Sequence, residues 1–384
     1  MADQNTESLR IVALTTGEFS NIFLKTVANE TSSNLITSPF SAQVALAMAA
    51  YGAGGRTATQ MRKSLLLPED NQLGKSGYKS LIERLNGVKG VELSIANKIY
   101  LAKQFEIKSA YKELTARTFL SRCEEVDFHN PDAAARTINS WCEQQTNNRI
   151  KNVIAKGSLH PNTALALVNV AYFKGSWAKR FDPSLTTDRL FHVDAKATKS
   201  VPTMFLKHTF RVGHLPEVNA RFIELPYQGN ELSMVIILPK EVNGLKAVLD
   251  NLHKVNLATR LKRTGPSHVE LSLPKFKIES TLNLEKSLKI LGMTDMFQDG
   301  ADFSGITDSG LKITKVIQKS FIEVNEEGSE AAAATVIVAM PISLDAQPPP
   351  PERFIVDRPV YYAIYHRDLE VTLFNGCLHQ PSVS

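Results

Sequence analysis

The chain has 384 residues, of which 43% are hydrophobic and 22% are charged, and its formal net charge is +5. This composition excludes an intrinsically disordered chain, because it supplies enough apolar side chains for a large core. No apolar run approaches the roughly 20 residues that a membrane-spanning helix needs, so no membrane partner is expected. No linker or repeat divides the chain, and we expect a single domain over residues 1–384.

The first third of the chain is predicted to be mainly helical, because apolar residues recur there at spacings of three and four. Helices are expected over residues 18–27, 41–51 and 58–65. Buried strands are expected in residues 91–101 and 165–173, where β-branched and aromatic residues alternate or run together. Further strands, separated by turn residues such as Gly229 and Asn230, are expected in residues 221–237 and 269–278. This mixture predicts an α+β fold.

A glycine-rich segment lies between the second and third expected helices, at residues 52–57. Its sequence, Gly-Ala-Gly-Gly-Arg-Thr, has the spacing of neither the dinucleotide-binding fingerprint nor the phosphate-binding P-loop. It also follows a helix-like run instead of a strand. A turn that ends a helix is therefore predicted.

A cluster of basic residues comes next in the chain, with Lys75, Lys79, Arg84 and Lys89 close together. Such a segment can attract polyanions, and weak binding of glycosaminoglycans is one interpretation. Glu83 interrupts the cluster, however, and no aromatic residues are interleaved as in many nucleic-acid-binding surfaces. An ordinary solvated helix face is the simpler interpretation, and no nucleic-acid partner is expected.

The three cysteines, Cys123, Cys142 and Cys377, are widely spaced and odd in number. This pattern predicts free thiols and argues against a disulfide framework or a Cys-x-x-Cys metal site. No metal and no cofactor are expected. Residues 1–7 lack the basic start and apolar middle of a signal peptide, which leaves open a cytoplasmic protein or a mature secreted one.

The sequence contains no recognisable catalytic constellation. Neither a Gly-x-Ser-x-Gly nucleophile elbow nor a His-Glu-x-x-His zinc motif is present. The nine histidines are scattered, without partners at metal-binding spacing. We expect a protein that is not an enzyme.

The most informative segment begins at the acidic pair Glu326 and Glu327 and continues through Gly328 into four successive alanines. Taken alone, such a run could form a surface helix. It is followed by three β-branched residues at 336–338, by Pro341 and by four prolines at 348–351, all of which disfavour a continued helix. A long exposed loop over about residues 326–358 is the better prediction.

These residues resemble the proximal hinge of the serpin family, which is an acidic pair, a glycine, a small hydroxyl residue and an alanine-rich run. Further resemblance lies at residues 38–41, 141, 146–149, 169–177, 201–204, 273–276, 357–359, 374–376 and 381, in the family's order. The resemblance implies a large central mixed sheet, surrounding helices and an exposed reactive-centre loop. The hinge residues that it implies are Glu326, Glu327, Gly328, Ser329, Ala331, Ala332, Ala333 and Ala334, and the shutter residues are Ser38, Ser41 and Gln318.

The resemblance also implies suicide inhibition: a target protease cleaves the loop, and the hinge then inserts as a strand into the central sheet with the protease still attached. Family spacing from Gly328 places the reactive bond between Ile342 and Ser343. Ile342 suits the pocket of an elastase-like serine protease, and cleavage after Leu344 would suit a chymotrypsin-like one. A bond after Ala339, preceded by Val338, would suit papain-like cysteine proteases instead.

Two departures from the family pattern bear on function. Gln318 stands where the family often carries a histidine, and Ser329 replaces the commoner threonine. Neither removes hydrogen-bonding capacity. A non-inhibitory serpin acting as a carrier or chaperone remains the alternative, but the small hinge residues favour an inhibitor that forms a covalent complex with its target protease. A monomer is expected.

Overall fold

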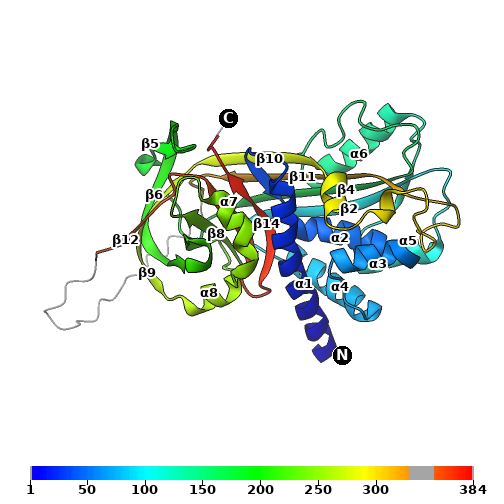
Figure 1. Cartoon of the computed structure of the whole chain (residues 1–384), viewed down its shortest axis with the longest axis horizontal. Coiled ribbons are helices and arrows are strands. Elements are labelled where there is room, and N and C mark those ends of the chain that lie inside the picture. The colour runs from blue at the N-terminus through cyan, green and yellow to red at the C-terminus, as the bar shows by residue number, and fades with distance from the viewer. Residues whose placement is uncertain (1, 328–349, 383–384) are drawn as a thin grey trace.

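The computed structural model describes residues 2–327 and 350–382. Within these residues two β-sheets and a set of helices form an elongated molecule (Figure 1). Among the described residues, no helix is both long and apolar enough to cross a membrane. The α+β prediction is confirmed.

Most of the long helices precede the long strands, as the sequence predicts. The α-helices of the described residues are α1 (Ala2–Ala28), α2 (Pro39–Ala50), α3 (Gly55–Ser64), α4 (Asn71–Asn86), α5 (Ser109–Thr118), α6 (Pro131–Gln145), α7 (Leu245–Asn251), α8 (Leu257–Arg263) and α9 (Glu285–Ile290). Short 3-10 turns are η1 (Pro183–Leu185), η2 (Pro216–Val218), η3 (Leu252–Lys254) and η4 (Asp295–Phe297). The helix expected at 18–27 is the second part of α1, which begins much earlier.

Among the described residues, one sheet contains nine strands, most of them antiparallel to their neighbours. Its path is β1 (Leu35–Thr37), β14 (Val371–Leu378), β13 (Val360–His366), β8 (Leu232–Pro239), β7 (Ala220–Pro226), β6 (Thr198–Leu215), β9 (Pro266–Pro274) and β12 (Glu352–Ile355). β5 (Thr187–His192) also pairs with β6, in an antiparallel hairpin.

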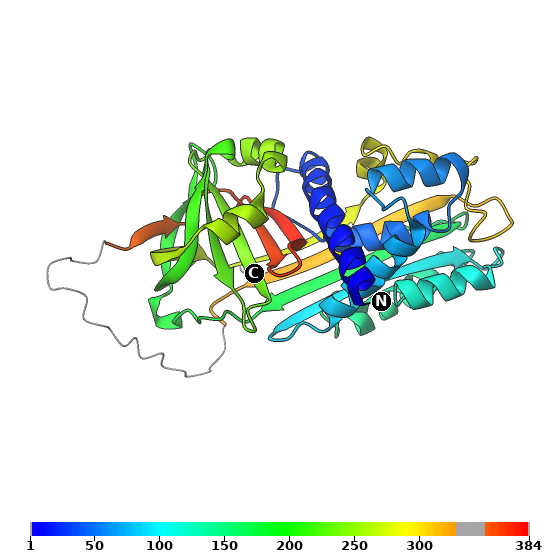
Figure 2. The ribbon, with the colours of Figure 1, turned by 90° about the horizontal axis from the view of Figure 1, so that it is seen from below.

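The other sheet is mixed and contains five strands from the part of the chain that the structure describes. Its order is β10 (Phe276–Asn283), β11 (Ile313–Val324), β4 (Leu165–Gly175), β2 (Val91–Ala102) and β3 (Glu124–Val126). Figure 2 shows its long strands side by side along the length of the molecule. The expected strand region 269–278 divides at Lys275, so that β9 and β10 belong to different sheets.

The middle of the five-stranded sheet is buried on both faces. Along β4, Leu167 and Ala171 belong to the cluster that contains α2, and Val168 and Val170 belong to the cluster that contains α6. This alternation follows from the two-residue repeat of a strand. All twelve residues of α2 are buried, as expected for a helix without a polar face.

Candidate functional site

The strands β4 and β11 meet along a parallel seam. Their residues pair in register from Ile313 and Leu165 to Glu323 and Lys174, so no other strand lies between them. β11 is also the strand that leads directly into residues 328–349. The seam is therefore the part of the sheet closest in sequence to the expected hinge.

A buried amide network crosses this seam on the α2 face. Gln318 and Asn169 are register partners, and Gln318 Nε2 donates to Asn169 Oδ1 at 2.7 Å. The same nitrogen donates to the Ser38 carbonyl at 2.8 Å, and the Ser38 amide donates to Gln318 Oε1 at 3.0 Å. Separating the two strands must break the Gln318–Asn169 bond.

The network continues from Asn169 toward β2. Asn169 Nδ2 donates to Ser41 Oγ and to Asn97 Oδ1, and Ser41 Oγ donates to Asn97 Oδ1 at 3.1 Å. Ser38, Ser41 and Gln318, the three residues that the family resemblance names as shutter residues, thus lie in one hydrogen-bond network. The structure adds Asn169, which opens the family-like segment 169–177 but is not predicted to bond here, and Asn97, whose only sequence signal is an amide side chain inside an apolar strand.

The opposite face of the seam is covered by aromatic side chains. Tyr172 on β4 and Phe321 on β11 are register partners, and their rings stack with centroids 5.1 Å apart. The guanidinium of Arg149 lies over the Tyr172 ring at 5.8 Å and pairs with Glu92 at 3.3 Å. Burial and the nearby Glu92 carboxylate raise the pKa of Tyr172 to about 12, so its ring stays uncharged at physiological pH.

The end of β11 is fastened by Trp177. Its indole Nε1 donates to the Asn325 carbonyl at 2.8 Å, and its backbone amide donates to the Glu327 carbonyl at 3.1 Å. The indole ring stacks on Tyr227 at 4.5 Å, which fixes its orientation. The Glu327 carboxylate pairs with Lys174 of β4 at 2.7 Å. These contacts hold the chain at the end of the seam where β4 and β11 both finish, immediately before residue 328.

Glu326 supplies a second anchor at the same place. Its carboxylate accepts a hydrogen bond from Thr186 Oγ1 at 2.8 Å and pairs with Lys275 at 2.8 Å, with only 12% of the side chain exposed. Burial by itself raises the pKa of this carboxyl, but the bonds from Lys275 and Thr186 outweigh burial and leave the pKa below its ordinary value of 4.5. Glu326 is therefore charged and bonded at neutral pH.

The family profile described as serpin, or serine protease inhibitor, matches residues 15–381. The chain belongs to the serpin family. Serpin B6 of Pongo abelii is 37% identical over 97% of this chain and 100% of its own length. The solved structure of Serpin48 from Tenebrio molitor superimposes with a TM-score of 0.85, at 32% identity over 97% of this chain and 98% of the other. Human thyroxine-binding globulin has a TM-score of 0.86 at 28% identity, over 98% of this chain and 100% of the other.

The family assignment confirms the fold that the resemblance implies, and the members of this family are generally protease inhibitors and not catalysts. The described part of this serpin includes two of the predicted hinge residues, Glu326 and Glu327. The remaining predicted site residues lie outside the described residues: Gly328, Ser329, Ala331, Ala332, Ala333, Ala334, Val338, Ala339, Ile342, Ser343 and Leu344.

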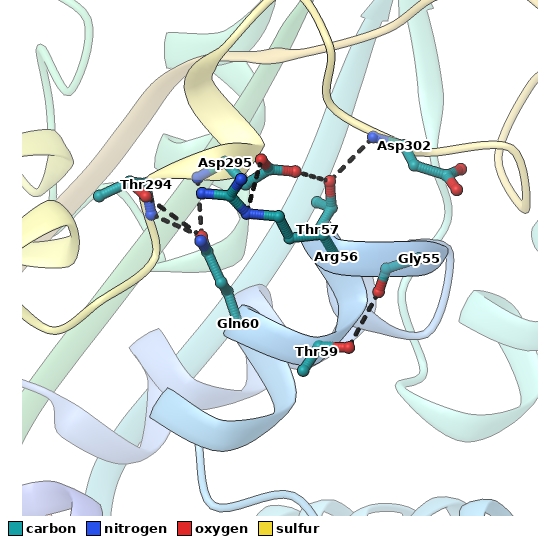
Figure 3. Close-up of polar contacts among 8 residues, drawn as sticks. All are labelled: Gly55, Arg56, Thr57, Thr59, Gln60, Thr294, Asp295 and Asp302. Carbon is teal, nitrogen blue, oxygen red and sulfur yellow. Dashed lines mark hydrogen bonds and ion pairs between the residues drawn. The ribbon is translucent and has the colours of Figure 1, made fainter.

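Side chains from α3 and from residues 294–302 bond to one another beside the glycine-rich turn of this serpin (Figure 3). The Gly54 amide, before α3, donates to the Asp302 carbonyl at 2.9 Å. A Cβ at Gly54 would lie only 2.5 Å from an Asp302 carboxylate oxygen. Thr57 Oγ1 accepts from the Asp302 amide at 2.9 Å and donates to Asp295. The predicted helix-ending turn is confirmed, and the Asp302 carboxylate packs directly against Gly54.

The basic residues of α4 are partly neutralised by neighbours. Lys79 pairs with Glu83 at 3.9 Å, and Arg84 pairs with Glu231 at 3.7 Å. The ammonium of Lys75 lies over the Tyr51 ring at 5.6 Å. At 3.6 residues per turn, Arg84 projects from the opposite side of the helix to Lys75. These positions disfavour one continuous basic stripe along α4.

Acidification is expected to release the Glu326 anchor. Because the pKa of Glu326 is lowered in the folded protein, the stability that its bonds contribute is present above the ordinary carboxyl pKa and is lost as the pH falls through the folded-state pKa, below 4.5. We expect a change in Trp177 fluorescence in this range, before global unfolding, measured in a Trp141→Phe background. Far-UV circular dichroism over the same range provides the control.

The variant Glu326→Gln should show the altered Trp177 emission already at neutral pH, with no further acid transition of this kind. An acid transition that is identical in the variant would assign the titration to another group.

Proposed function

We propose that this serpin is a suicide inhibitor of proteases, cleaved between Ile342 and Ser343, and that its hinge then inserts between β4 and β11. The target protease would remain attached through an acyl bond to Ile342 and be carried along the sheet. Glu326 and Glu327 would mark the fixed end of the moving segment, because their described contacts already fasten the chain there.

The parallel β4–β11 seam is the observation that supports this proposal most strongly. A strand that follows β11 after a chain reversal runs antiparallel to β11, and it is therefore antiparallel to β4 as well. Insertion would replace one parallel ladder by two antiparallel ladders, and parallel pairing is slightly less stable per residue. The inserted strand would also bury side chains and satisfy backbone groups that the uncleaved segment cannot place in the sheet.

The energy of insertion is retained before cleavage because both ends of the segment are tied down. The upstream end is held by the contacts of Asn325, Glu326 and Glu327, and the downstream end continues into β12, which pairs with β9. A strand made of residues 328–342 would span about 50 Å, against about 40 Å for the 12 residues of β11. The segment is long enough to cross the sheet once its downstream end is cut.

The residue at the reactive bond sets the target class. Ile342 has no charge to pair with the acidic pocket of a trypsin-like protease, so we propose an elastase- or chymotrypsin-like serine protease. Cleavage after Leu344 is compatible with the second of these. Cross-class inhibition of papain-like cysteine proteases would instead use the bond after Ala339, with Val338 in the preceding position.

The proposal is tested by mixing the protein with an elastase, a chymotrypsin, a trypsin and a papain-like protease. A denaturant-resistant protease-linked band, together with a released peptide that begins at Ser343, is the expected result. Cleavage without a stable complex would favour the carrier or chaperone alternative. A peptide that begins elsewhere would move the reactive bond.

Replacing Ile342 by arginine should redirect the inhibitor to trypsin. The new guanidinium can pair with a buried carboxylate in the protease pocket, so we expect the rate of complex formation with trypsin to rise by about 100-fold or more. The control is Leu344→Arg, which places the same charge on the leaving side of the bond. Equal gains for both variants would contradict the assignment of Ile342.

A further inference from the structure

A cavity of about 440 Å³ lies between α1, the α7–η3 segment and α9. Its walls are the second half of α1 with the turn that follows it, Leu249 of α7, His253 of η3, and Lys286 and Ile290 of α9. α1 packs against all of these elements, and Figure 1 shows α7 beside α1. Among the described residues, none from either sheet lines this α1–α9 cavity. Its volume is within the range of pockets that hold small organic molecules.

The α1–α9 cavity exposes apolar side chains to solvent. Ile22 of α1 is 46% exposed and Ile290 of α9 is 63% exposed, and the half-buried Leu249 of α7 lines the same cavity. The described part of the chain exposes only six large apolar side chains, and two of them meet here. Ile22 and Ile290 are far apart in the sequence, so the fold brings them together. A ligand with an apolar part would gain free energy by covering both.

Lys286, which lines the cavity from α9, is only loosely paired. Its Nζ lies 3.7 Å from the Glu30 carboxylate, which is longer than a hydrogen bond, and its side chain is 73% exposed. The Glu30 carboxylate has a closer partner, because Ser287 Oγ donates to it at 2.7 Å. The ammonium group of Lys286 can therefore turn to an anion in the cavity with little loss of pairing.

Lys25, which lines the cavity from α1, is in a similar state. Its Nζ lies 4.0 Å from the Asp250 carboxylate and donates to the Asp250 carbonyl at 3.2 Å. The Asp250 carboxylate pairs more closely with Lys246, at 2.8 Å. The positive charge of Lys25 is therefore only partly neutralised, and it stands on the opposite wall from Lys286.

The remaining charges of the lining favour an anion as well. Glu30 is the one acidic residue that lines the cavity, against the two lysines Lys25 and Lys286. The end of α1 also faces the cavity, and exposed carbonyls there would repel an anion. Its carbonyls at Lys25, Val27 and Ala28 accept instead from the amides of residues 29–31, at 3.0 to 3.4 Å. The lining thus combines an apolar surface with a net positive charge.

We propose that the α1–α9 cavity binds a small amphipathic anion, which has one apolar chain and one carboxylate or similar acidic group. The apolar chain covers Ile22, Leu249 and Ile290, and the acidic group pairs with Lys25 and Lys286. This inference goes beyond protease inhibition and does not depend on it, because no residue of the cavity takes part in the seam or in the anchors of Glu326 and Glu327.

The first test compares three ligands by isothermal titration calorimetry with the full-length protein. Decanoate has both the chain and the charge, decan-1-ol keeps the chain, and acetate keeps the carboxylate. We expect decanoate to bind about threefold to tenfold more tightly than decan-1-ol, because two exposed lysines add a modest attraction. Acetate should not bind measurably, since most of the affinity comes from the buried chain.

Apolar variants then locate the site. Ile22→Glu places a carboxylate beside the bound chain, and we expect it to weaken decanoate binding by about tenfold or more. Ile290→Glu makes the same change from α9 and should have the same effect. Leu14→Glu is the matched control, because Leu14 is 51% exposed on α1 but does not line the cavity. It should leave the affinity unchanged.

Charge variants test the recognition of the acidic group. We expect Lys286→Gln to weaken decanoate binding by about threefold and to leave decan-1-ol binding unchanged. Lys289→Gln is the control on the same helix, because Lys289 is paired with Glu285 at 2.7 Å and lies over the Phe297 ring at 5.3 Å. It should change neither affinity. Thermal unfolding of each variant verifies that these exposed substitutions leave the fold intact.

Several results would overturn the proposal. One is that decanoate fails to bind the unsubstituted protein, and another is that it binds the Ile22→Glu and Ile290→Glu variants equally well. Equal affinities for decanoate and decan-1-ol would reject an anion as the ligand. A dimer that dissociates on Ile22→Glu would show that a second copy of the chain covers the cavity. Protease trapping is expected to be the same in all variants, so failure of the inhibitory function would leave this test intact.

Discussion

Replacing Ala332 or Ala333 by arginine is expected to convert the protein from an inhibitor into a substrate. Successive residues of an inserted strand point to opposite faces of the sheet. At the seam both faces are packed, one against α2 and the other against α6. Burying an unpaired guanidinium in either layer is costly, so insertion should slow at either position. Every 1.4 kcal/mol added to the insertion barrier slows insertion about tenfold.

Slower insertion gives the protease time to hydrolyse its acyl bond and leave. We therefore expect the rate of cleavage at Ile342 to be unchanged and the number of inhibitor molecules consumed per trapped protease to rise about tenfold or more. Gln347→Arg is the matched control, because it adds the same charge on the side of the bond that does not insert. Unimpaired trapping by both hinge variants would contradict insertion at the β4–β11 seam.

Replacing Asn169 by alanine is expected to destabilise the uncleaved protein by about 2–4 kcal/mol. Asn169 is 2% exposed and bonds to Gln318 across the seam and to Ser41 and Asn97 on its own side. Its loss leaves several of these buried polar atoms unsatisfied. It also removes one of the side-chain hydrogen bonds that join β4 to β11, so the seam should open more readily.

Two measurements test this prediction. Urea unfolding reports the free energy of unfolding, and the loss of inhibitory activity during warm incubation, with native gels, reports opening of the seam. Asn283→Ala in the same sheet is the control, because Asn283 is exposed at the end of β10 and its loss should change stability by no more than about 0.5 kcal/mol. An Asn169→Ala protein as stable as this control would show that the network contributes little.

The sequence predicts those features of the fold that depend on local periodicity. The strands β2 and β4 and the apolar helix α2 lie where expected, because their patterns are long and need no partner to be recognised. Residues 91–98 of β2 are less buried than expected, and only residues 99–102 are fully buried. The sequence pattern does not predict the early start of α1 at Ala2. Its first turns are polar, and their position depends on close packing with α4, where a Cβ at Gly77 would lie 2.4 Å from the Ser8 carbonyl oxygen.

The candidate site could be predicted only in part, for a similar physical reason. A pattern in one strand shows which face a residue occupies but not which residue lies opposite it. The register of β4 against β11 places Asn169 beside Gln318. Ser38, the residue immediately before α2, donates its backbone amide to Gln318. Trp177 could be named from its motif, yet its bonds to Asn325 and Glu327 depend on two segments that are far apart in the chain.

The wide separation of β4 and β11 in the chain has a consequence for biosynthesis. β4 ends at Gly175 and β11 begins only at Ile313, so the ribosome delivers one side of the seam long before the other. Until β11 arrives, β4 can pair with β2 but presents its other edge unpaired, and such edges recruit strands from neighbouring chains. The nascent protein therefore passes through an interval in which a chaperone that shields β4 would raise the yield of correctly closed molecules.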